Sequence, residues 1–179
     1  MFKACVIGLG YVGLPILKNL SKKYKTVGYD TNHKRIQNLK KRIDIFSEFN
    51  KNDLSEINTT YTTEIEKVSS CNLFIVAVPT PVFLNKKPNL SHLKDVCNKI
   101  SKILKKNNII IFESTVYPGV TNDFCINILE KKSKLNEGKD FFVGYSPERV
   151  NPGDKKHSLK NINKILAYPH NYKKKDLKK

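Results

Sequence analysis

The sequence lacks any apolar run of about 20 residues, the length that a helix needs to cross a bilayer. It also lacks the pattern of a secretory signal peptide, because Met1-Phe2-Lys3 leads directly into a short apolar run that ends at glycines. Both absences argue against a membrane protein or an exported one. We therefore expect a cytoplasmic protein with no membrane partner.

Cysteine is scarce as well. The four cysteines, Cys5, Cys71, Cys97 and Cys125, are widely spaced, form no CxxC pair and do not lie beside a histidine at metal-ligand spacing. Each stands in an apolar context, which is typical of a small buried side chain. We expect no metal site. A catalytic thiol stays open as an alternative, although no neighbouring residue supports it.

Arginine is rarer still, with three residues in a chain whose net charge is +17. The lysines are spread over nearly every predicted helix, and aromatic residues do not alternate with them. Because arginine is the residue that most often contacts base edges and phosphates, this pattern argues against specific nucleic-acid binding. It predicts weak adhesion to polyanions at low salt and a field that attracts anionic ligands. A basic nucleic-acid-binding protein remains a remote alternative.

Apolar runs alternate with segments of helical periodicity along the chain. The predicted strands cover residues 2–8, 25–30, 72–78, 108–113 and 140–145, with short strands near 59–62 and 163–168. The predicted helices cover residues 12–22, 33–43, 91–106 and 118–132, with one short helix within 44–58 and another that opens at the capping-box pattern Thr63–Glu66.

Strands that are continuous apolar runs, each followed by a helix, predict a mostly parallel sheet with helices on both faces. The expected fold class is therefore α/β, of the doubly wound, Rossmann type. Residues 1–168 form the expected domain. Residues 169–179 form a lysine-rich tail that has little to bury, and we expect it to be disordered.

The stretch CVIGLGYVGLP, residues 5–15, contains a GxGxxG pattern between a predicted strand and a predicted helix. Gly8 permits the tight turn, Gly10 lets the backbone approach a pyrophosphate, and Gly13 permits close packing of helix on strand. Asp30 ends the next strand, where a carboxylate accepts hydrogen bonds from a ribose and disfavours a 2′-phosphate. The pattern therefore predicts NAD rather than NADP, although Lys34 and Arg35 weaken that preference. A purely structural turn is the alternative.

Three further motifs, Val78–Pro81, Glu113–Gly119 and Tyr145–Asp154, follow three predicted strands. Ligands of such sheets bind beyond the carboxyl ends of the strands, so all three motifs are expected at the same edge. Within the last motif, Glu148 is suited to orient water or a hydroxyl, and Arg149 to grip a sugar hydroxyl or a diphosphate. The alternatives are ordinary turns and a structural salt bridge.

Four of these stretches, GLGYVGLP, AVPTP, ESTVYPGVT and GYSPERVNPGD, occur in an order and at spacings that resemble the N-terminal domain of the UDP-glucose/GDP-mannose dehydrogenase family. The resemblance covers roughly residues 3–167. The form SPERVNPGD is similar to the branch that oxidises UDP-N-acetylhexosamines, namely UDP-N-acetylmannosamine, -glucosamine or -galactosamine. Enzymes of the UDP-glucose branch usually carry a second glutamate where this chain has Pro152.

The resemblance implies oxidation of C6 of a nucleotide sugar to the uronate with two NAD per sugar, in surface polysaccharide biosynthesis. It implies a substrate contact at Arg149 and Val150 and an acid–base role for Glu148. Thr115 would help to position the catalytic water. The positions that it matches to NAD contacts are Tyr11, Val12, Asp30, Arg35, Thr80 and Thr115.

The chain departs from the family in what it does not contain. Family members continue into a long helix with a catalytic lysine and asparagine, a nucleotide-binding domain and a nucleophilic cysteine in a GGxC setting, which none of the four cysteines has. The resemblance ends near Ala167, so it implies a truncated member that binds NAD but lacks full activity alone and engages a UDP-sugar only with the missing half supplied. The family is homodimeric, but the usual dimer helix is absent here. The alternative is a non-catalytic dinucleotide-binding module or a remnant.

Overall fold

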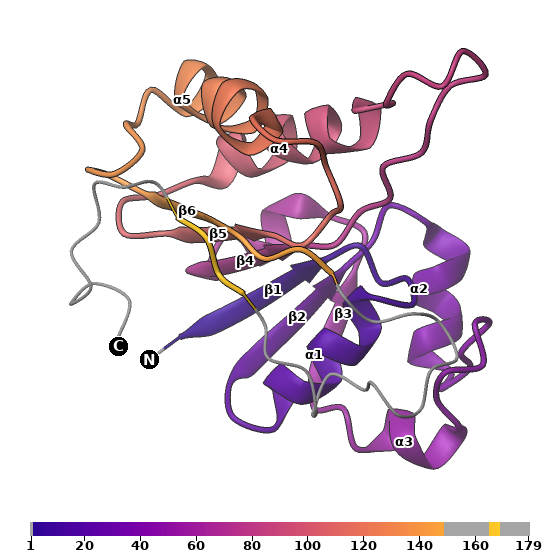
Figure 1. Cartoon of the computed structure of the whole chain (residues 1–179). Coiled ribbons are helices and arrows are strands. Elements are labelled where there is room, and N and C mark those ends of the chain that lie inside the picture. Colours follow the sequence, from indigo (N-terminus) through magenta and orange to yellow (C-terminus); the bar gives the residue numbers. More distant parts are fainter. Residues whose placement is uncertain (1, 149–164, 169–179) are drawn as a thin grey trace.

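The computed structural model describes residues 2–148 and 165–168, and within them the chain forms a six-stranded sheet between two layers of helices (Figure 1). The strand order is β3-β2-β1-β4-β5-β6, and every neighbouring pair of these strands is parallel. The predicted doubly wound α/β class is confirmed.

The strands follow the apolar runs closely. They are β1 (Lys3–Ile7), β2 (Lys25–Tyr29), β3 (Thr59–Thr62), β4 (Leu73–Val76), β5 (Ile109–Phe112) and β6 (Phe142–Tyr145). The helical elements are α1 (Gly13–Ser21), α2 (His33–Lys40), α3 (Lys51–Ser55), the 3-10 helix η1 (Ile65–Val68), α4 (Ser91–Ile103), the π-helix η2 (Val120–Ile126) and α5 (Asn127–Ser133).

Both faces of the sheet are buried, which explains why the strands are apolar throughout. On β1, Cys5 and Ile7 belong to the core beneath α4 and α5, whereas Val6 belongs to a second core beneath α1 and α2. Figure 1 shows α4 and α5 on one side of the sheet and α1, α2 and α3 on the other. Among the helices of the described residues, none combines the length and the apolar character that a membrane span requires.

The winding direction reverses at the centre of the sheet. From β1 the chain moves outward to β2 and β3, then returns to place β4 on the opposite side of β1. Open α/β sheets bind ligands at such a switch point, beyond the carboxyl ends of the two central strands. The topology therefore indicates a ligand site at the loops that follow β1 and β4.

The predicted capping box at Thr63–Glu66 is wrong. The hydroxyl of Thr62, at the end of β3, accepts the backbone N–H of Glu64 at 3.0 Å, and the Glu64 side chain pairs with Lys67 at 2.6 Å. The helix begins one residue later than predicted, with Glu64 rather than Thr63 at the N-cap position, and it has no side-chain cap. A true capping box forms at α3, where Asn50 and Asp53 bond each other's backbone N–H.

Two other predicted elements differ in form. The helix predicted over 118–132 consists of η2 followed by α5, and it begins after Gly119, whose φ is +94°. Of the strand predicted at 163–168, Ala167 forms a two-bond antiparallel bridge with Tyr145, while residues 163–164 lie outside the described residues. The predicted tail at 169–179 also lies outside them.

Candidate cofactor site

A cavity of about 800 Å³ opens at the switch point of the sheet. Its lining comes from the ends of β1, β2, β4 and β5 and from the residues that follow them, with contributions from the first turns of α4 and from Glu148, which follows β6. Pockets of roughly 300–1,000 Å³ are typical of small-molecule and cofactor sites. This edge is where the sequence predicts the glycine turn and the loop motifs to meet.

The three glycines of the turn have three different surroundings. Gly8 has a φ of +89°, and a Cβ there would lie 2.6 Å from the carbonyl oxygen of Ala77. A Cβ on Gly13 would lie 1.8 Å from the carbonyl oxygen of Gly8, so α1 packs directly on the turn. A Cβ on Gly10 would meet nothing within 4 Å, and Gly10 lines the cavity. Bare backbone at the start of a helix is suited to bind a pyrophosphate, so the turn fits the predicted group.

Asp30, directly after β2, forms part of the cavity wall. Its Oδ2 accepts the backbone N–H of Leu9 at 2.9 Å, and its Oδ1 accepts that of Asn32 at 2.8 Å. These two bonds fix the carboxylate against the glycine turn. A carboxylate offers about four lone-pair sites, so Asp30 retains capacity to accept ribose hydroxyls.

Arg35, in the first turn of α2, is 3% exposed although it lies in the cavity wall. Its Nε donates to the carbonyl oxygen of Leu9 at 2.7 Å, and its Nη1 donates to Oδ1 of Asp44 at 2.6 Å. The Phe46 ring centroid lies 4.8 Å from the guanidinium carbon. The sequence predicts Arg35 as a cofactor contact, and the structure shows that its guanidinium is already held by groups of this chain.

The loops after β4 and β5 are joined by two side-chain hydrogen bonds. The hydroxyl of Thr80 donates to the carbonyl oxygen of Thr115, and that of Ser114 donates to the carbonyl oxygen of Val78, each at 2.6 Å. The two loops therefore form one continuous wall of the cavity. This wall lies on the opposite side of β1 from β2, because β4 and β5 follow β1 in the strand order.

Most predicted site residues meet at this cavity. Its lining includes Gly8, Gly10, Tyr11, Val12, Asp30, Arg35, Thr80, Thr115 and Glu148. Gly13 supports the turn from behind. Arg149 and Val150 lie outside the described residues.

The lining also contains residues that the sequence did not single out as site residues: Leu9, Ile45, Phe46, His92, Asp95, Glu113 and Ser114. For some of these residues the sequence contains a pattern that could have identified them. Ile45 and Phe46 form an apolar pair within a polar segment, and Glu113 and Ser114 begin one of the loop motifs. For His92 and Asp95, in the first turns of α4, the sequence offers no signal.

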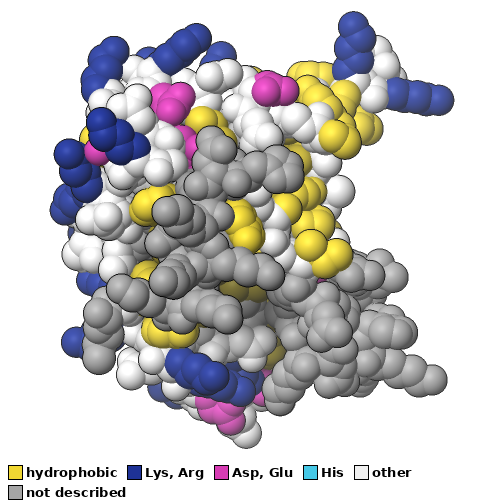
Figure 2. Space-filling view, turned by 60° about the vertical axis from the view of Figure 1, so that its left-hand side comes forward, with side chains coloured by type: hydrophobic (Ala, Val, Ile, Leu, Met, Phe, Trp, Pro, Cys, Tyr) yellow, Lys and Arg dark blue, Asp and Glu magenta, His cyan; other side chains and the backbone are white. Residues whose placement is uncertain are grey.

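The cavity differs in charge from the rest of the chain. Its described lining contains the carboxylates of Asp30, Asp95, Glu113 and Glu148, and Arg35 alone among arginines and lysines. On the face drawn in Figure 2, lysines and arginines lie in separate groups rather than in one stripe. The described lining of the cavity is therefore acidic on balance, although the chain as a whole is strongly basic.

The cysteines lie in the core and not in the cavity lining. All four are buried and unpaired by disulfides. Burial raises the pKa of the Cys5 thiol, and a hydrogen bond with Cys125 together with burial raises that of Cys97. A thiol held in this way is a poor nucleophile, because the thiolate is the reactive form. The described residues also contain no group of three or more His, Cys, Asp or Glu side chains placed to hold a metal ion.

Comparison with known proteins connects this geometry to one family. Residues 2–178 match the UDP-glucose/GDP-mannose dehydrogenase family, NAD binding domain. Curated relatives include a UDP-N-acetyl-D-glucosamine 6-dehydrogenase from Salmonella typhi, 46% identical over 92% of this chain and 39% of its own length. Protein CapL from Staphylococcus aureus is 44% identical over 90% of this chain and 38% of its own length. The chain thus spans about two-fifths of the length of these relatives.

Solved structures agree with the sequence matches. A UDP-D-ManNAc dehydrogenase from Pyrococcus horikoshii superposes with a TM-score of 0.79 at 32% identity, covering 84% of this chain and 37% of the other. An NDP-N-acetyl-D-galactosaminuronic acid dehydrogenase from Methanosarcina mazei superposes with a TM-score of 0.84 at 26% identity, covering 94% and 39%. With its parallel sheet, glycine turn and Asp30 in the expected places, the chain belongs to the UDP-glucose/GDP-mannose dehydrogenase family and represents its NAD-binding domain.

Proposed function

We propose that this chain is the NAD-binding part of a nucleotide-sugar 6-dehydrogenase that oxidises C6 of a UDP-N-acetylhexosamine to the uronate. The observation that carries the proposal is the open backbone at Gly10, which faces a cavity bounded by Asp30 on one side. The relative from Salmonella typhi supports the choice of sugar, because it is named for UDP-N-acetyl-D-glucosamine and is 46% identical.

The cavity suggests how the dinucleotide would lie. The pyrophosphate would rest on the backbone of Gly10, Tyr11 and Val12 at the start of α1, where the helix dipole favours negative charge. The adenosine ribose would reach Asp30. The nicotinamide would then extend to the loops that carry Thr80 and Thr115, because they form the remaining wall beyond the central strands.

The catalytic roles are proposals of the same kind. Bound NAD would accept a hydride from C6 of the sugar. Glu148 would serve as the acid–base group, and Thr115, with its exposed side chain, would help to position a water. Arg149 and Val150 would contact the substrate. Thr115 follows β5 and Glu148 follows β6, and both line the cavity proposed for the cofactor.

We propose further that this chain alone binds NAD and turns over little or no substrate. Oxidation of an aldehyde to a carboxylate through a covalent intermediate needs a positioned thiolate, and all four thiols here are buried away from the cavity. The other part of such an enzyme, with its UDP-binding residues, would have to be supplied for sugar binding. We propose a cytoplasmic location and no specific nucleic-acid partner. Any dimer contact would be formed by the other part of the enzyme.

Calorimetric titration with NAD, with NADP as the control ligand and at moderate salt, tests the proposal. We expect NAD to bind more tightly than NADP. Absence of NAD binding would contradict it. In parallel, NADH formation is followed with purified chain and UDP-N-acetylglucosamine, and steady production would contradict the proposed lack of turnover.

A non-catalytic dinucleotide-binding module is the second candidate, and the burial of all four thiols favours it for the isolated chain. The two candidates differ in their response to the missing part. A dehydrogenase fragment should gain activity when the rest of a related enzyme, including its nucleotide-binding domain, is added in trans. A module should bind NAD equally well and stay inactive.

A further inference from the structure

Arg35 is the one arginine or lysine among the described residues that line the cavity, and it lies next to Asp30. Both side chains contact the same residue of the glycine turn, since Asp30 accepts the N–H of Leu9 and Arg35 donates to its carbonyl oxygen. A guanidinium at this position can accommodate the 2′-phosphate of NADP. It would then oppose the preference for NAD that Asp30 creates.

Asp44 removes that possibility by occupying the guanidinium. Its side chain is fully buried, that of Arg35 is 3% exposed, and their N–O distance is 2.6 Å. A buried pair of opposite charges attracts strongly, because little water screens it. Phe46 covers the guanidinium at 4.8 Å. The charge that faces the ribose end of the cavity is therefore the carboxylate of Asp30, with Arg35 neutralised.

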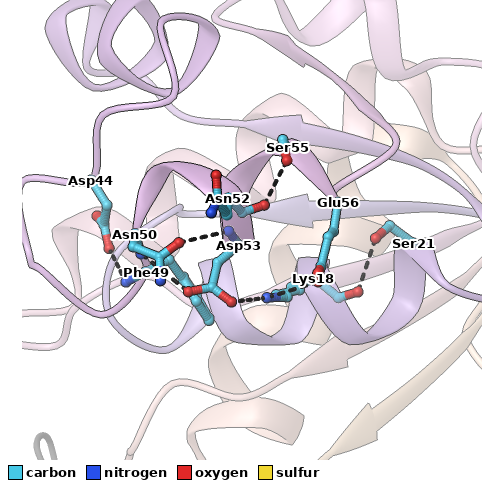
Figure 3. Close-up of polar contacts among 9 residues, drawn as sticks. All are labelled: Lys18, Ser21, Asp44, Phe49, Asn50, Asn52, Asp53, Ser55 and Glu56. Carbon is cyan, nitrogen blue, oxygen red and sulfur yellow. Dashed lines mark hydrogen bonds and ion pairs between the residues drawn. The ribbon is translucent and has the colours of Figure 1, made fainter.

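Asp44 is itself held by the segment that follows it. Its two carboxylate oxygens accept the backbone N–H groups of Phe46, Glu48 and Phe49 at 3.1–3.3 Å. Figure 3 shows Asp44 beside Phe49, at the edge of the network that also contains Asp53 and Lys18. The orientation of Asp44 toward Arg35 is thus fixed by the turn and does not depend on a bound ligand.

One donor of the guanidinium is left over. Nη2 of Arg35 is buried and has no hydrogen-bond partner among the described residues. If the charge of Asp44 were removed, Nη1 would lose its charged acceptor, and Nη2 would still have no partner among the described residues. A guanidinium in that state binds phosphate in a bidentate manner when one is offered.

We propose that Asp44 is a positioning residue that sets dinucleotide specificity: it neutralises and immobilises Arg35, and so prevents the cavity from accepting the 2′-phosphate of NADP. The inference rests on the proposed function, because it concerns which dinucleotide the cavity prefers. It assigns the preference to Asp30 and Asp44 together.

The test compares the NADP and NAD affinities of the full chain by calorimetry. Asp44→Asn keeps the shape of the side chain and removes its charge, and it should raise NADP affinity relative to NAD about tenfold. Asp44→Ser, whose hydroxyl can still accept a backbone N–H of the turn, should act in the same direction. Circular dichroism and thermal melting identify the variants that fold.

Asp53→Asn is the matched control. Asp53 also accepts a backbone N–H, from Asn50 at 3.2 Å, and also pairs with a cation, Lys18 at 2.7 Å, but it does not line the cavity. The substitution raises the net charge by the same amount, so it should leave the NADP-to-NAD ratio unchanged. A shift equal to that of Asp44→Asn would reduce the effect to net charge and overturn the inference.

The double variant Asp44→Asn with Arg35→Gln distinguishes two effects of the single variant. One is release of the Arg35 guanidinium, and the other is a loosened turn after Asp44. If the freed guanidinium binds the 2′-phosphate, the ratio should return to that of the unaltered chain. The inference would be overturned if the NADP-to-NAD affinity ratio stayed raised in the double variant, or if no folded Asp44 variant changed that ratio. In either case, NAD binding by the unaltered chain would still support the proposed function. An unaltered chain that binds neither dinucleotide would overturn both.

Discussion

The cavity has two walls, and they hold their polar groups in different ways. The first wall consists of Leu9–Val12, Asp30–Asn32, Arg35 and Ile45–Phe46, and charged side chains bonded to backbone fix it. The second wall consists of Ala77–Pro81 and Glu113–Thr115, and bonds from neutral hydroxyls to carbonyl oxygens fix it.

The difference suggests a division of work between the walls. Arg35 in the first wall is paired with Asp44, which leaves Asp30 as the charge that faces the ligand, so a change there alters which ligand charge the cavity accepts. Hydroxyl groups in the second wall carry no net charge, so a change there alters the relative position of two loops. Variants of the first wall should therefore affect adenosine recognition, and variants of the second should affect the nicotinamide end.

The largest expected effect breaks the first wall at its base. Gly13→Ala would place a Cβ 1.8 Å from the backbone carbonyl oxygen of Gly8, and because a Cβ cannot rotate away from its own backbone, α1 must move. We expect a loss of more than about 3 kcal/mol of unfolding free energy. Urea unfolding measures it.

Gly10→Ala provides the matched control for that change. Its Cβ would enter open space at the cavity, so stability should change by less than about 1 kcal/mol while NAD affinity falls. Equal stability losses in the two variants would contradict the assignment of packing to Gly13 and of ligand approach to Gly10.

The next effect tests the charge in the first wall. Asp30→Ala removes the acceptor of two backbone N–H groups and the proposed ribose ligand. We expect NAD affinity to fall at least about tenfold, with a stability loss of about 1–3 kcal/mol. Calorimetry with NAD and NADP measures both the affinity and the discrimination. Unchanged NAD affinity in the folded variant would refute the role of Asp30.

A smaller effect separates the second wall from the first. Thr80→Val and Ser114→Ala each remove one hydroxyl donor that ties the two loops, and each should cost about 1 kcal/mol of stability. NAD affinity should fall by a few-fold, while the affinity for ADP-ribose, which lacks the nicotinamide, should not change. Equal losses for both ligands would mean that the walls do not divide the dinucleotide as proposed.

The smallest effect concerns the outer support of the first wall. A hydrogen bond from Lys18 lowers the pKa of Asp53, and the backbone N–H of Asn50 adds to the shift. A carboxyl whose pKa is lowered on folding stabilises the fold above its unfolded pKa of about 3.9, and loses that contribution as pH falls through the folded pKa. Asp53→Asn should therefore flatten the decline of Tm below about pH 4. An acid decline identical to that of the unaltered chain would contradict this.

Much of the first wall could be predicted from the sequence, because the residues that form it lie close together in the chain and follow a recognisable pattern. A strand, three glycines at fixed spacing, a helix and an acid at the end of the next strand together predict Gly8, Gly10 and Asp30 in the cavity wall, as observed. The role of Asp44 could not be predicted, since its contact with Arg35 depends on how the segment after α2 turns back. The uncapped start of η1 could not be predicted either, because the chain leaves β3 with Glu64 rather than Thr63 at the N-cap position.

The second wall shows a different limit. Strand-end motifs predicted that Thr80 and Thr115 would share an edge, and both line the cavity. Their hydrogen bond joins residues 35 positions apart, and no local pattern encodes it. Arg149 and Val150 remain predictions, since they lie outside the described residues.

Amide chemical-shift mapping by NMR during titration with NAD tests the central claim most directly, namely that the dinucleotide binds across both walls of this cavity. The account predicts that shifts concentrate at Leu9–Val12, Asp30–Asn32, Val78, Thr80 and Ser114–Thr115, and that they persist at moderate salt. Shifts spread over the lysine-bearing helices that vanish as salt rises, or no shifts at all, would contradict it, because binding would then reflect net charge or would not occur.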